Sequence, residues 1–156
     1  MGNIRLYSTK DCEAIVALFY NTVHEVNTSD YDKEQLDAWA PSKIDIDRWC
    51  APLSSSYSLV YVDASHIIGF GNMTDEGVLD RLYVDYQHQG EGIGSLLLDK
   101  LENYAASQGI KTISAHVSIT ARHFFERHGY NIKKEQIVER NNIQLTNYLM
   151  EKNLNI

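Results

Sequence analysis

The fold of this chain is decided by a glycine-rich stretch near its middle, Gln89-Gly90-Glu91-Gly92-Ile93-Gly94. Residues 78–84 before it have the alternation of a strand, and residues 92–107 have helical periodicity. Glycines in such a strand-to-helix loop let a ligand approach the backbone closely. The first amides of the helix lack partners within it, and the helix dipole favours an anion there. We therefore expect a phosphate or pyrophosphate ligand, with a plain tight turn as the alternative interpretation.

Two other phosphate-binding motifs fit this stretch poorly. A P-loop requires a Lys followed by Ser or Thr after its last glycine, whereas Ile93-Gly94-Ser95 follows Gly92. A dinucleotide-binding fold places its glycines after the first strand of a βαβ unit. Here the stretch lies in mid-chain, after several expected strands. Neither motif therefore explains the loop.

The composition is that of a globular protein with a single domain, residues 1–156. The net charge is −7, from 14 Lys plus Arg against 21 Asp plus Glu, which argues against a nucleic-acid partner and is compatible with a cationic amine substrate. No apolar run approaches the ~18 residues of a membrane span. The N-terminus has no signal-peptide pattern. We therefore expect a cytoplasmic protein without a membrane partner.

The cysteines and histidines predict neither a disulfide nor a metal site. Cys12 and Cys50 are too few for a disulfide framework, and we expect two free thiols in a reducing compartment. The six histidines show no H-x-x-x-H or Cys/His ligand spacing, so no metal is expected.

The remaining patterns predict a mixed sheet with helices on its faces. Residues 8–11 fit a capping box, and the helix behind it is expected to end near Val26. Pro52 and the serines after it are expected to break the chain, and Asn141-Asn142 is expected to form a hairpin turn. The further helices are expected at 30–40, 44–49, 92–107 and 121–128, and the strands at 3–7, 58–62, 67–71, 78–84, 111–117, 130–140 and 143–152.

Several segments, in this order, resemble one family. The loop matches the pattern Q/R-x-x-G-x-G/A at every defined position, after Ile67-Ile68-Gly69-Phe70 and Leu82-Tyr83-Val84. The late helix ends in Phe124-Phe125-Glu126-Arg127-His128-Gly129-Tyr130. Together they resemble the GNAT (GCN5-related) N-acetyltransferase superfamily, in a bacterial branch with F-F-E-R-x-G-F/Y here. The resemblance implies an α/β (α+β) GNAT acyl-CoA N-acyltransferase fold, with a mixed, mostly antiparallel six- to seven-stranded sheet, about four flanking helices and a V-shaped cleft between two central strands.

The resemblance also implies acetyl-CoA as the co-substrate, lying between the strands that end at Val84 and Val117. Backbone groups of Leu82, Tyr83 and Val84 are expected to pair with the pantetheine arm. Ser118, Ala121, Phe124 and Phe125 are expected on the other side of the arm. The pyrophosphate is expected on the amides of Gln89, Gly90, Glu91, Gly92, Ile93, Gly94 and Ser95.

The implied activity is direct acetyl transfer to a primary amine of a small molecule, a peptide or a protein. An N–H near Val84 would polarise the thioester carbonyl, and a base would take the proton of the amine. Many relatives protonate the leaving thiolate with a tyrosine where this chain has Phe125. A catalytically weak acyl-CoA-binding or sensor domain is therefore the alternative function. A nucleotide-binding regulatory domain is a third, which only the loop supports.

Asp80 and His24 are the leading candidates for the base. Asp80 shares strand parity with Leu82 and Val84, which predicts a common face. A solvated carboxylate, or a salt bridge to Arg81 or Arg122, is the alternative. A histidine titrates near neutral pH, which suits His24, with a structural histidine as the alternative. Two weaker candidates are Glu76 and His116.

The remaining site residues concern the proton donor and the acceptor. Tyr83 is a candidate for the donor, with Tyr130 and Tyr148 as alternatives. The early helices cap this end of the cleft in relatives, and ordinary packing is the alternative role for their residues. The acceptor wall is expected to include His24, Tyr31, Gln35 and Trp39. A homodimer is among the expected assembly states.

Overall fold

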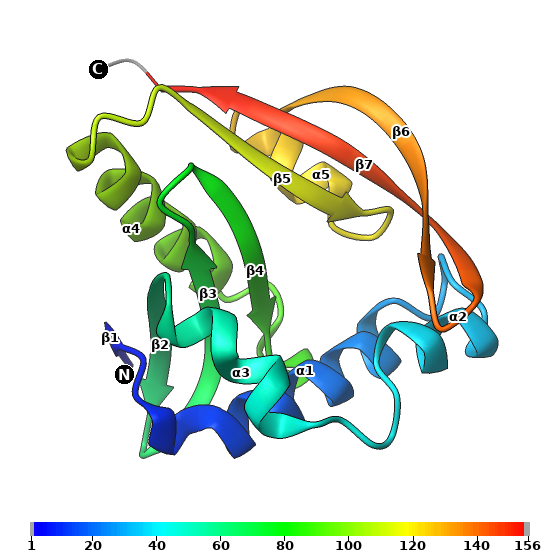
Figure 1. The fold of residues 1–156 in the computed structure, drawn as a ribbon. Helices are drawn as coiled ribbons and strands as arrows, with labels where there is room; N and C mark the ends of the chain where they lie inside the picture. Colours follow the sequence, from blue (N-terminus) through cyan, green and yellow to red (C-terminus); the bar gives the residue numbers. More distant parts are fainter. Residues whose placement is uncertain (1, 155–156) are drawn as a thin grey trace.

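The computed structural model describes residues 2–154 and has one seven-stranded sheet with helices on both faces (Figure 1). The order of strands across the sheet is β1-β2-β3-β4-β5-β7-β6, and only the β4–β5 pair is parallel. This confirms the expected mixed, mostly antiparallel sheet. The strands are β1 (Asn3–Leu6), β2 (Tyr57–Asp63), β3 (His66–Met73), β4 (Val78–Val84), β5 (Thr112–Ser118), β6 (Asn131–Arg140) and β7 (Ile143–Asn153).

Five α-helices are present among residues 2–154, against about four expected. They are α1 (Cys12–Val26), α2 (Lys33–Trp39), α3 (Ile46–Ser54), α4 (Ile93–Ser107) and α5 (Arg122–Arg127), with short 3-10 turns at Thr9–Asp11 and Tyr86–His88. No helix in this part of the chain is long and apolar enough to cross a membrane. The β6–β7 turn has positive φ at Asn141 (48°) and Asn142 (66°), which confirms the predicted hairpin.

Two apolar cores hold the helices against the sheet. On one face, Leu97 and Leu101 of α4 and Phe125 of α5 are buried with the sheet residues. On the other face, Phe19 of α1 packs in a core with Phe70 of β3. Burying one such side chain contributes about 1.5–3 kcal/mol, so α1 and α4 are firmly attached to a rigid sheet. The strands between them therefore provide a fixed base for the cleft.

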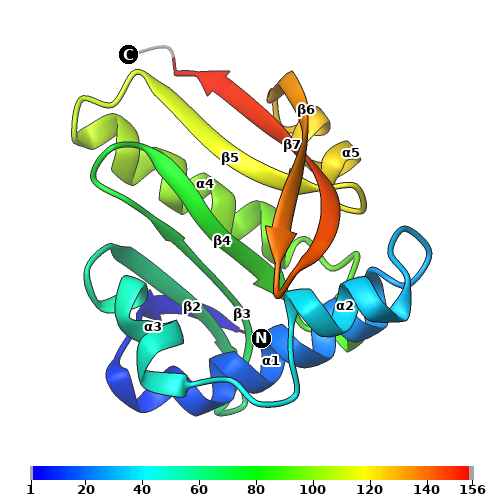
Figure 2. The ribbon, with the colours of Figure 1, turned by 45° about the vertical axis from the view of Figure 1, so that its right-hand side comes forward.

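The parallel strands β4 and β5 pair only near their beginnings. Val78 pairs with Ser114, Leu79 pairs with Ala115, and no later residues of the two strands pair. The strands then diverge toward Val84 and Ser118 (Figures 1 and 2). Beyond Leu79, β4 therefore has backbone groups that face an open gap instead of a neighbouring strand. This is the V-shaped opening that the resemblance implied.

The predicted chain break at Pro52 is wrong, because Pro52 lies inside α3. A proline removes one helical N–H, but α3 ends two residues later, so little of the helix depends on it. The serines that follow satisfy the last carbonyls of the helix. The Pro52 oxygen accepts from the hydroxyls of Ser55 (3.3 Å) and Ser56 (2.6 Å), and the Leu53 oxygen accepts from Ser58 (2.6 Å).

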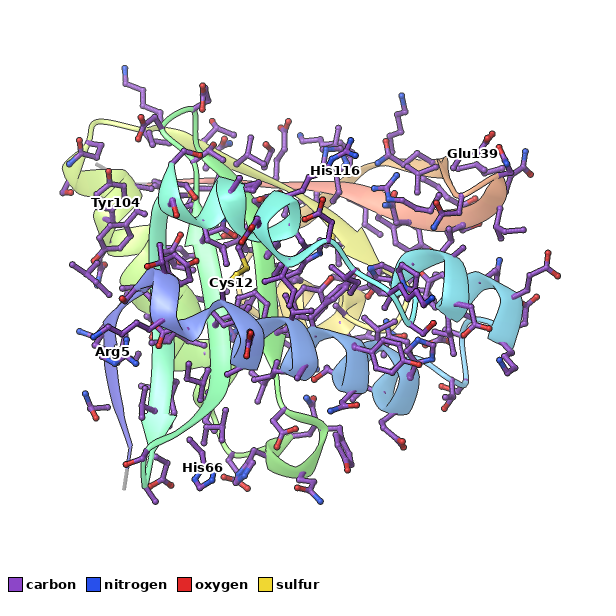
Figure 3. All side chains as sticks on the ribbon, turned by 60° about the horizontal axis from the view of Figure 1, so that its bottom comes forward. Arg5, Cys12, His66, Tyr104, His116 and Glu139 are labelled. Carbon is purple, nitrogen blue, oxygen red and sulfur yellow. A yellow bond between two sulfur atoms is a disulfide. The ribbon has the colours of Figure 1, made fainter. Side chains whose placement is uncertain are left out.

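The prediction of two free thiols is also wrong, because Cys12 and Cys50 form a disulfide (Figure 3). Their Cα atoms are 6.1 Å apart, within the range that a disulfide requires. The bond joins the first residue of α1 to the middle of α3. The two cysteines are 38 residues apart, and sequence spacing does not reveal that α3 packs on the start of α1.

Candidate functional site

Two cavities open between the diverging strands and meet where the strands part. The loop-side cavity, of about 540 Å³, extends toward the glycine-rich loop, α4 and α5. The hairpin-side cavity, of about 500 Å³, extends toward α1, α3 and the β6–β7 hairpin. The residues that line both cavities mark their junction, and they are Trp39, Leu79, Asp80, Arg81, Tyr83, His116 and Ser118.

The glycine-rich loop forms one end of the loop-side cavity. Gly90 and Gly92 have positive φ (76° and 83°), and an added Cβ at either would meet nothing within 4 Å. Gly92 is the N-cap of α4, and the Leu96 N–H makes the bond back to Gly92 O, so the amides before Leu96 have no helical acceptor. All predicted loop residues line the cavity except Glu91, whose carboxylate lies 3.3 Å from His88 Nδ1. Those that line it are Gln89, Gly90, Gly92, Ile93, Gly94 and Ser95.

The end of β4 forms the adjoining wall through Leu82, Tyr83 and Val84. The Asp85 N–H donates to Ile68 O of β3 at 2.9 Å. Because N–H groups alternate in direction along a strand, the Val84 N–H points into the gap. The Val84 oxygen accepts from Gln89 Nε2 at 2.7 Å and from the Thr22 hydroxyl at 3.3 Å. The loop and α1 thus fix the end of β4 and leave the Val84 N–H toward the cavity.

The opposite wall comes from the end of β5 and from α5. Ser118, Ala121, Phe124 and Phe125 all line the loop-side cavity, and their contact with a ligand stays a prediction. Phe125 is only 6% exposed, and its ring packs edge-on against Phe124 and Tyr130. This wall is therefore largely apolar, and its residue 125 has no proton to donate.

Asp80 lies at the junction because of a β-bulge. Asn72 pairs with Arg81 and Met73 pairs with Leu79, so Asp80 is the extra residue on β4. Leu79 and Leu82 are three positions apart, so regular alternation would place them on opposite faces, yet both pack in the core that contains α4. The bulge at Asp80 therefore changes the alternation of the strand. The prediction that Asp80 shares the face of Leu82 and Val84 is therefore wrong.

The Asp80 carboxylate faces the α1 side of the sheet, where Asn72 Nδ2 donates to its Oδ2 at 3.2 Å. Its side chain is 38% exposed. Arg81 Nε lies 3.9 Å from the same oxygen, but the guanidinium stacks on Trp49 at 3.8 Å and donates to Trp49 O at 2.8 Å. Burial lowers the pKa of Arg81. The carboxylate thus remains accessible at the junction of the two cavities.

Tyr83 projects from β4 toward α1, opposite to its neighbours Leu82 and Val84. Its ring centroid lies 5.1 Å from that of Phe19 and 5.6 Å from that of Phe70. Burial in these aromatic surroundings raises the pKa of Tyr83 to about 12, so the phenol keeps its proton at neutral pH. The junction therefore holds the Asp80 carboxylate and the protonated phenol of Tyr83, together with Arg81 and His116.

His24 does not line either cavity. Its Nε2 lies 2.8 Å from Ala40 O, which requires the proton on Nε2, and its ring packs on Tyr20 with centroids 4.3 Å apart. Nδ1 lies 3.9 Å from Asp37 Oδ1. The ring thus joins α1 to the end of α2, and its catalytic role stays a prediction.

The segment around α2 closes the hairpin-side cavity. The Tyr31 hydroxyl donates to Thr146 O at 2.6 Å and accepts from the Ile119 N–H at 2.9 Å, and burial raises its pKa. Gln35 Nε2 donates to Gln144 O at 3.0 Å, and Gln35 does not line the cavity. Tyr31 and Trp39 do line it. The structure therefore brings two of the four predicted acceptor-wall residues to the cavity.

Other residues of the hairpin-side cavity were not singled out from the sequence as a site. They come from α1, α3, β6 and β7, which are distant in sequence and meet because β7 lies between β5 and β6. Strand alternation could place such residues on one face, but it could not indicate which face meets the cleft. The set includes Phe19, Trp49, Gln136, Val138, Arg140 and Asn147. Within residues 2–154, no cluster of three or more metal-ligating side chains could hold a metal ion.

Two parallel strands that splay within an otherwise antiparallel sheet, with a helix N-terminus facing the gap, define the acyl-CoA-dependent N-acyltransferases as a class. The chain belongs to the GNAT acetyltransferase family, since residues 27–152 match the family described as "Acetyltransferase (GNAT) domain". It is therefore an acetyl-CoA-dependent acyltransferase.

Known proteins resemble the chain over nearly its whole length. It is 34% identical over 152 residues, 96% of each chain, to the uncharacterised N-acetyltransferase YafP of Escherichia coli K12. A GCN5-related N-acetyltransferase from Rhodopseudomonas palustris superposes with a TM-score of 0.95 at 29% identity, covering 99% of this chain and 96% of that one. The PaiA N-acetyltransferase of Thermoplasma acidophilum, solved with coenzyme A, has a TM-score of 0.82 at 19% identity, with 99% of each chain covered, and shows the same fold.

Proposed function

We propose that the protein transfers an acetyl group from acetyl-CoA to a primary amine of a small molecule, peptide or protein, by direct attack in a ternary complex. The meeting of the two cavities at Asp80 and Tyr83 supports this proposal. A donor entering from the loop side and an acceptor entering from the hairpin side would reach each other there. Such juxtaposition removes much of the entropic barrier to a bimolecular reaction.

The residues around the loop-side cavity fit acetyl-CoA. Open space beside Gly90 and Gly92 and the amides of Ile93 to Ser95 suit a pyrophosphate, because these N–H groups have no acceptor within the helix. The unpaired edge of β4 at Leu82 and Val84 suits an extended amide-containing arm, which would add to the sheet like a strand. The apolar wall of Phe124 and Phe125 suits the methylene groups of that arm.

Three groups then perform the chemistry. The Val84 N–H stabilises the negative charge on the thioester oxygen as the amine nitrogen bonds to the carbonyl carbon. Asp80 takes the proton that the nitrogen loses, and the carbon–sulfur bond breaks. Tyr83, with its pKa of about 12, is a weaker acid than a thiol with a pKa of ~8.5. It therefore stabilises the departing thiolate by a hydrogen bond, and the thiolate takes its final proton from solvent.

The hairpin-side cavity offers the acceptor an aromatic wall beside a carboxylate. Phe19, Trp39 and Trp49 supply apolar surface, and Asp80 would attract the ammonium form of the amine. The bound ammonium releases one proton to solvent, and the neutral nitrogen then attacks. Tyr31 contributes its ring, since both hydrogen bonds of its hydroxyl are already made to β7 and to the β5–α5 loop. We therefore propose acceptor amines that carry an apolar or aromatic body.

A sensor domain that binds acyl-CoA and turns over slowly is the second candidate function. The observation that favours it is Phe125, an apolar ring at the position where the family resemblance implies a proton-donating tyrosine. Departure of the thiolate without a proton donor would then limit the rate of turnover. Turnover with amines separates the two functions. A sensor would bind acetyl-CoA, but added amines would not increase the rate at which free thiol is released.

The direct test follows free thiol after mixing the protein with acetyl-CoA and a panel of primary amines. Asp80→Asn keeps the shape of the side chain and its bond from Asn72 but removes the base, so we expect kcat to fall by about 10²–10⁴-fold. Acetyl-CoA affinity should change little. Asp75→Asn is the matched control, since Asp75 is an exposed carboxylate in the β3–β4 turn of the same hairpin and lines neither cavity.

A further inference from the structure

Asn72 is a fully buried amide on β3, directly beside Asp80. Its exposed fraction is 0%, and it lies on the same face of the sheet as Phe70. Nδ2 donates to Asp80 Oδ2 at 3.2 Å and to Ser56 Oγ at 2.9 Å. Oδ1 is buried and has no hydrogen-bond partner among the described residues. An unpaired buried acceptor destabilises a fold, so packing alone does not account for an asparagine at this position.

The neighbouring hydrogen bonds fix the orientation of the amide. The Ser56 hydroxyl donates its proton to Pro52 O at 2.6 Å, so its oxygen accepts from Asn72. Turning the amide over would bring Oδ1 against the Ser56 oxygen and against the Asp80 carboxylate, which are both acceptors. The NH₂ group therefore faces Asp80, and Ser56 anchors it from the other side.

We infer that Asn72 is a positioning residue for acetyl transfer and aims the Asp80 carboxylate at the junction of the two cavities. The inference rests on the proposed function, in which Asp80 takes the proton of the amine. Asp80 is the extra residue of a bulge and has no partner residue on β3. Its nearest cation is the Arg81 guanidinium, with Nε 3.9 Å away. Without the bond from Asn72, the carboxylate would turn toward Arg81. It would then point at the bound amine for a smaller fraction of the time, and proton transfer would be slower.

A double-mutant cycle tests this role. Asn72→Leu is close in size and removes both the donor to Asp80 and the unpaired oxygen. We expect kcat to fall about ten-fold, as for loss of one hydrogen bond to a charged group. KM for acetyl-CoA should not change, because Asn72 lines neither cavity. The midpoint of thermal unfolding should not fall, and in the Asp80→Asn background the same substitution should change kcat by less than about two-fold.

Ser56→Ala provides a second variant, which decides the question if Asn72→Leu does not fold. It removes the anchor behind the amide, so we expect a loss of about two- to five-fold in kcat that disappears in the Asp80→Asn background. Ser55→Ala is its matched control. Ser55 donates to the same Pro52 oxygen at 3.3 Å but does not contact Asn72, so kcat should stay at the wild-type value.

The outcomes separate this inference from the function on which it rests. If Asp80→Asn lowers kcat while Asn72→Leu and Ser56→Ala do not, the positioning role falls and the proposed function stands. Losses that simply add in the double variants show a general structural role and overturn the inference. Full turnover by Asp80→Asn, or no turnover by the wild-type protein with any amine, contradicts both.

Discussion

Tyr83 and Phe125 line the loop-side cavity from its two opposite walls. Tyr83 comes from β4 and Phe125 from α5, and both residues line the cavity. Burial keeps Tyr83 protonated with a pKa of about 12, whereas Phe125 has no acidic proton. We therefore propose that the hydroxyl of Tyr83 stabilises the leaving sulfur.

Replacing this hydroxyl tests the assignment. Tyr83→Phe should lower kcat by about ten-fold, since a hydrogen bond to a charged atom contributes roughly 1.5–3 kcal/mol. The raised pKa determines how the effect of the substitution depends on pH, because the phenol keeps its proton at every pH below about 12. The ratio of wild-type to variant kcat should therefore stay constant between about pH 6 and pH 10. A ratio that falls toward one at alkaline pH would show that Tyr83 ionises in this range.

The opposite residue gives a complementary prediction. Phe125→Tyr should raise the kcat of the wild-type protein by no more than about three-fold, because Tyr83 already supplies a donor. In the Tyr83→Phe background it should recover most of the lost activity. Steady-state kinetics of the four variants measures both effects. A ten-fold gain from Phe125→Tyr alone would mean that the thiolate leaves unassisted in the native protein.

The two ends of α4 have different roles despite similar glycines. Gly92 at its N-terminus and Gly109 just after its C-terminus both have positive φ, 83° and 77°, with open space where a Cβ would lie. A substitution at either therefore introduces similar backbone strain of about 1–2 kcal/mol. Only the N-terminus presents unpaired amides to the loop-side cavity.

Paired aspartates at these positions test the anion site. Gly92→Asp should weaken CoA binding by at least about 100-fold, because a carboxylate would occupy the position of the pyrophosphate and repel it. Gly109→Asp should leave the affinity unchanged while losing similar stability. Isothermal titration with CoA measures the first quantity and urea unfolding the second. Equal CoA affinities for the two variants would contradict the proposal that this loop binds the pyrophosphate.

Elements with local signals were predictable from the sequence, and the junction of the cavities was not. The glycine-rich loop, α4 and the Asn141-Asn142 turn depend on neighbouring residues, and the structure confirms them. The orientation of Asp80 depends on a bulge, which is a property of two strands rather than of one. The aromatic wall comes from α1, α2 and α3, which fold onto the sheet from distant positions. Strand parity alone therefore assigned Asp80 to the wrong face.

At the scale of the whole molecule, the Cys12–Cys50 disulfide joins α1 and α3, two of the helices that pack in the core on one face of the sheet. Trp49 of α3 and Phe19 of α1, which line the hairpin-side cavity, lie close together with ring centroids 4.9 Å apart. The bond therefore holds together the part of the molecule that forms the aromatic wall.

Removing this cross-link should destabilise the fold. Replacing Cys12 and Cys50 together by alanine should lower the free energy of unfolding by about 2–4 kcal/mol, the range for a loop closed over 38 residues. Urea unfolding with and without a thiol reductant measures this, since the reductant should remove most of the difference between wild type and variant. Two free thiols in the unfolded, unreduced wild-type protein would contradict the disulfide.

The central claim is that the two cavities bring acetyl-CoA and an amine together at Asp80. Amine-dependent release of free thiol from acetyl-CoA, measured for the wild-type protein and for Asp80→Asn, tests it most directly. The account predicts rapid release with at least one apolar or aromatic primary amine, the matching N-acetyl product, and a loss of about 10²–10⁴-fold in the variant. Release that no amine accelerates, or that Asp80→Asn leaves unchanged, would contradict it.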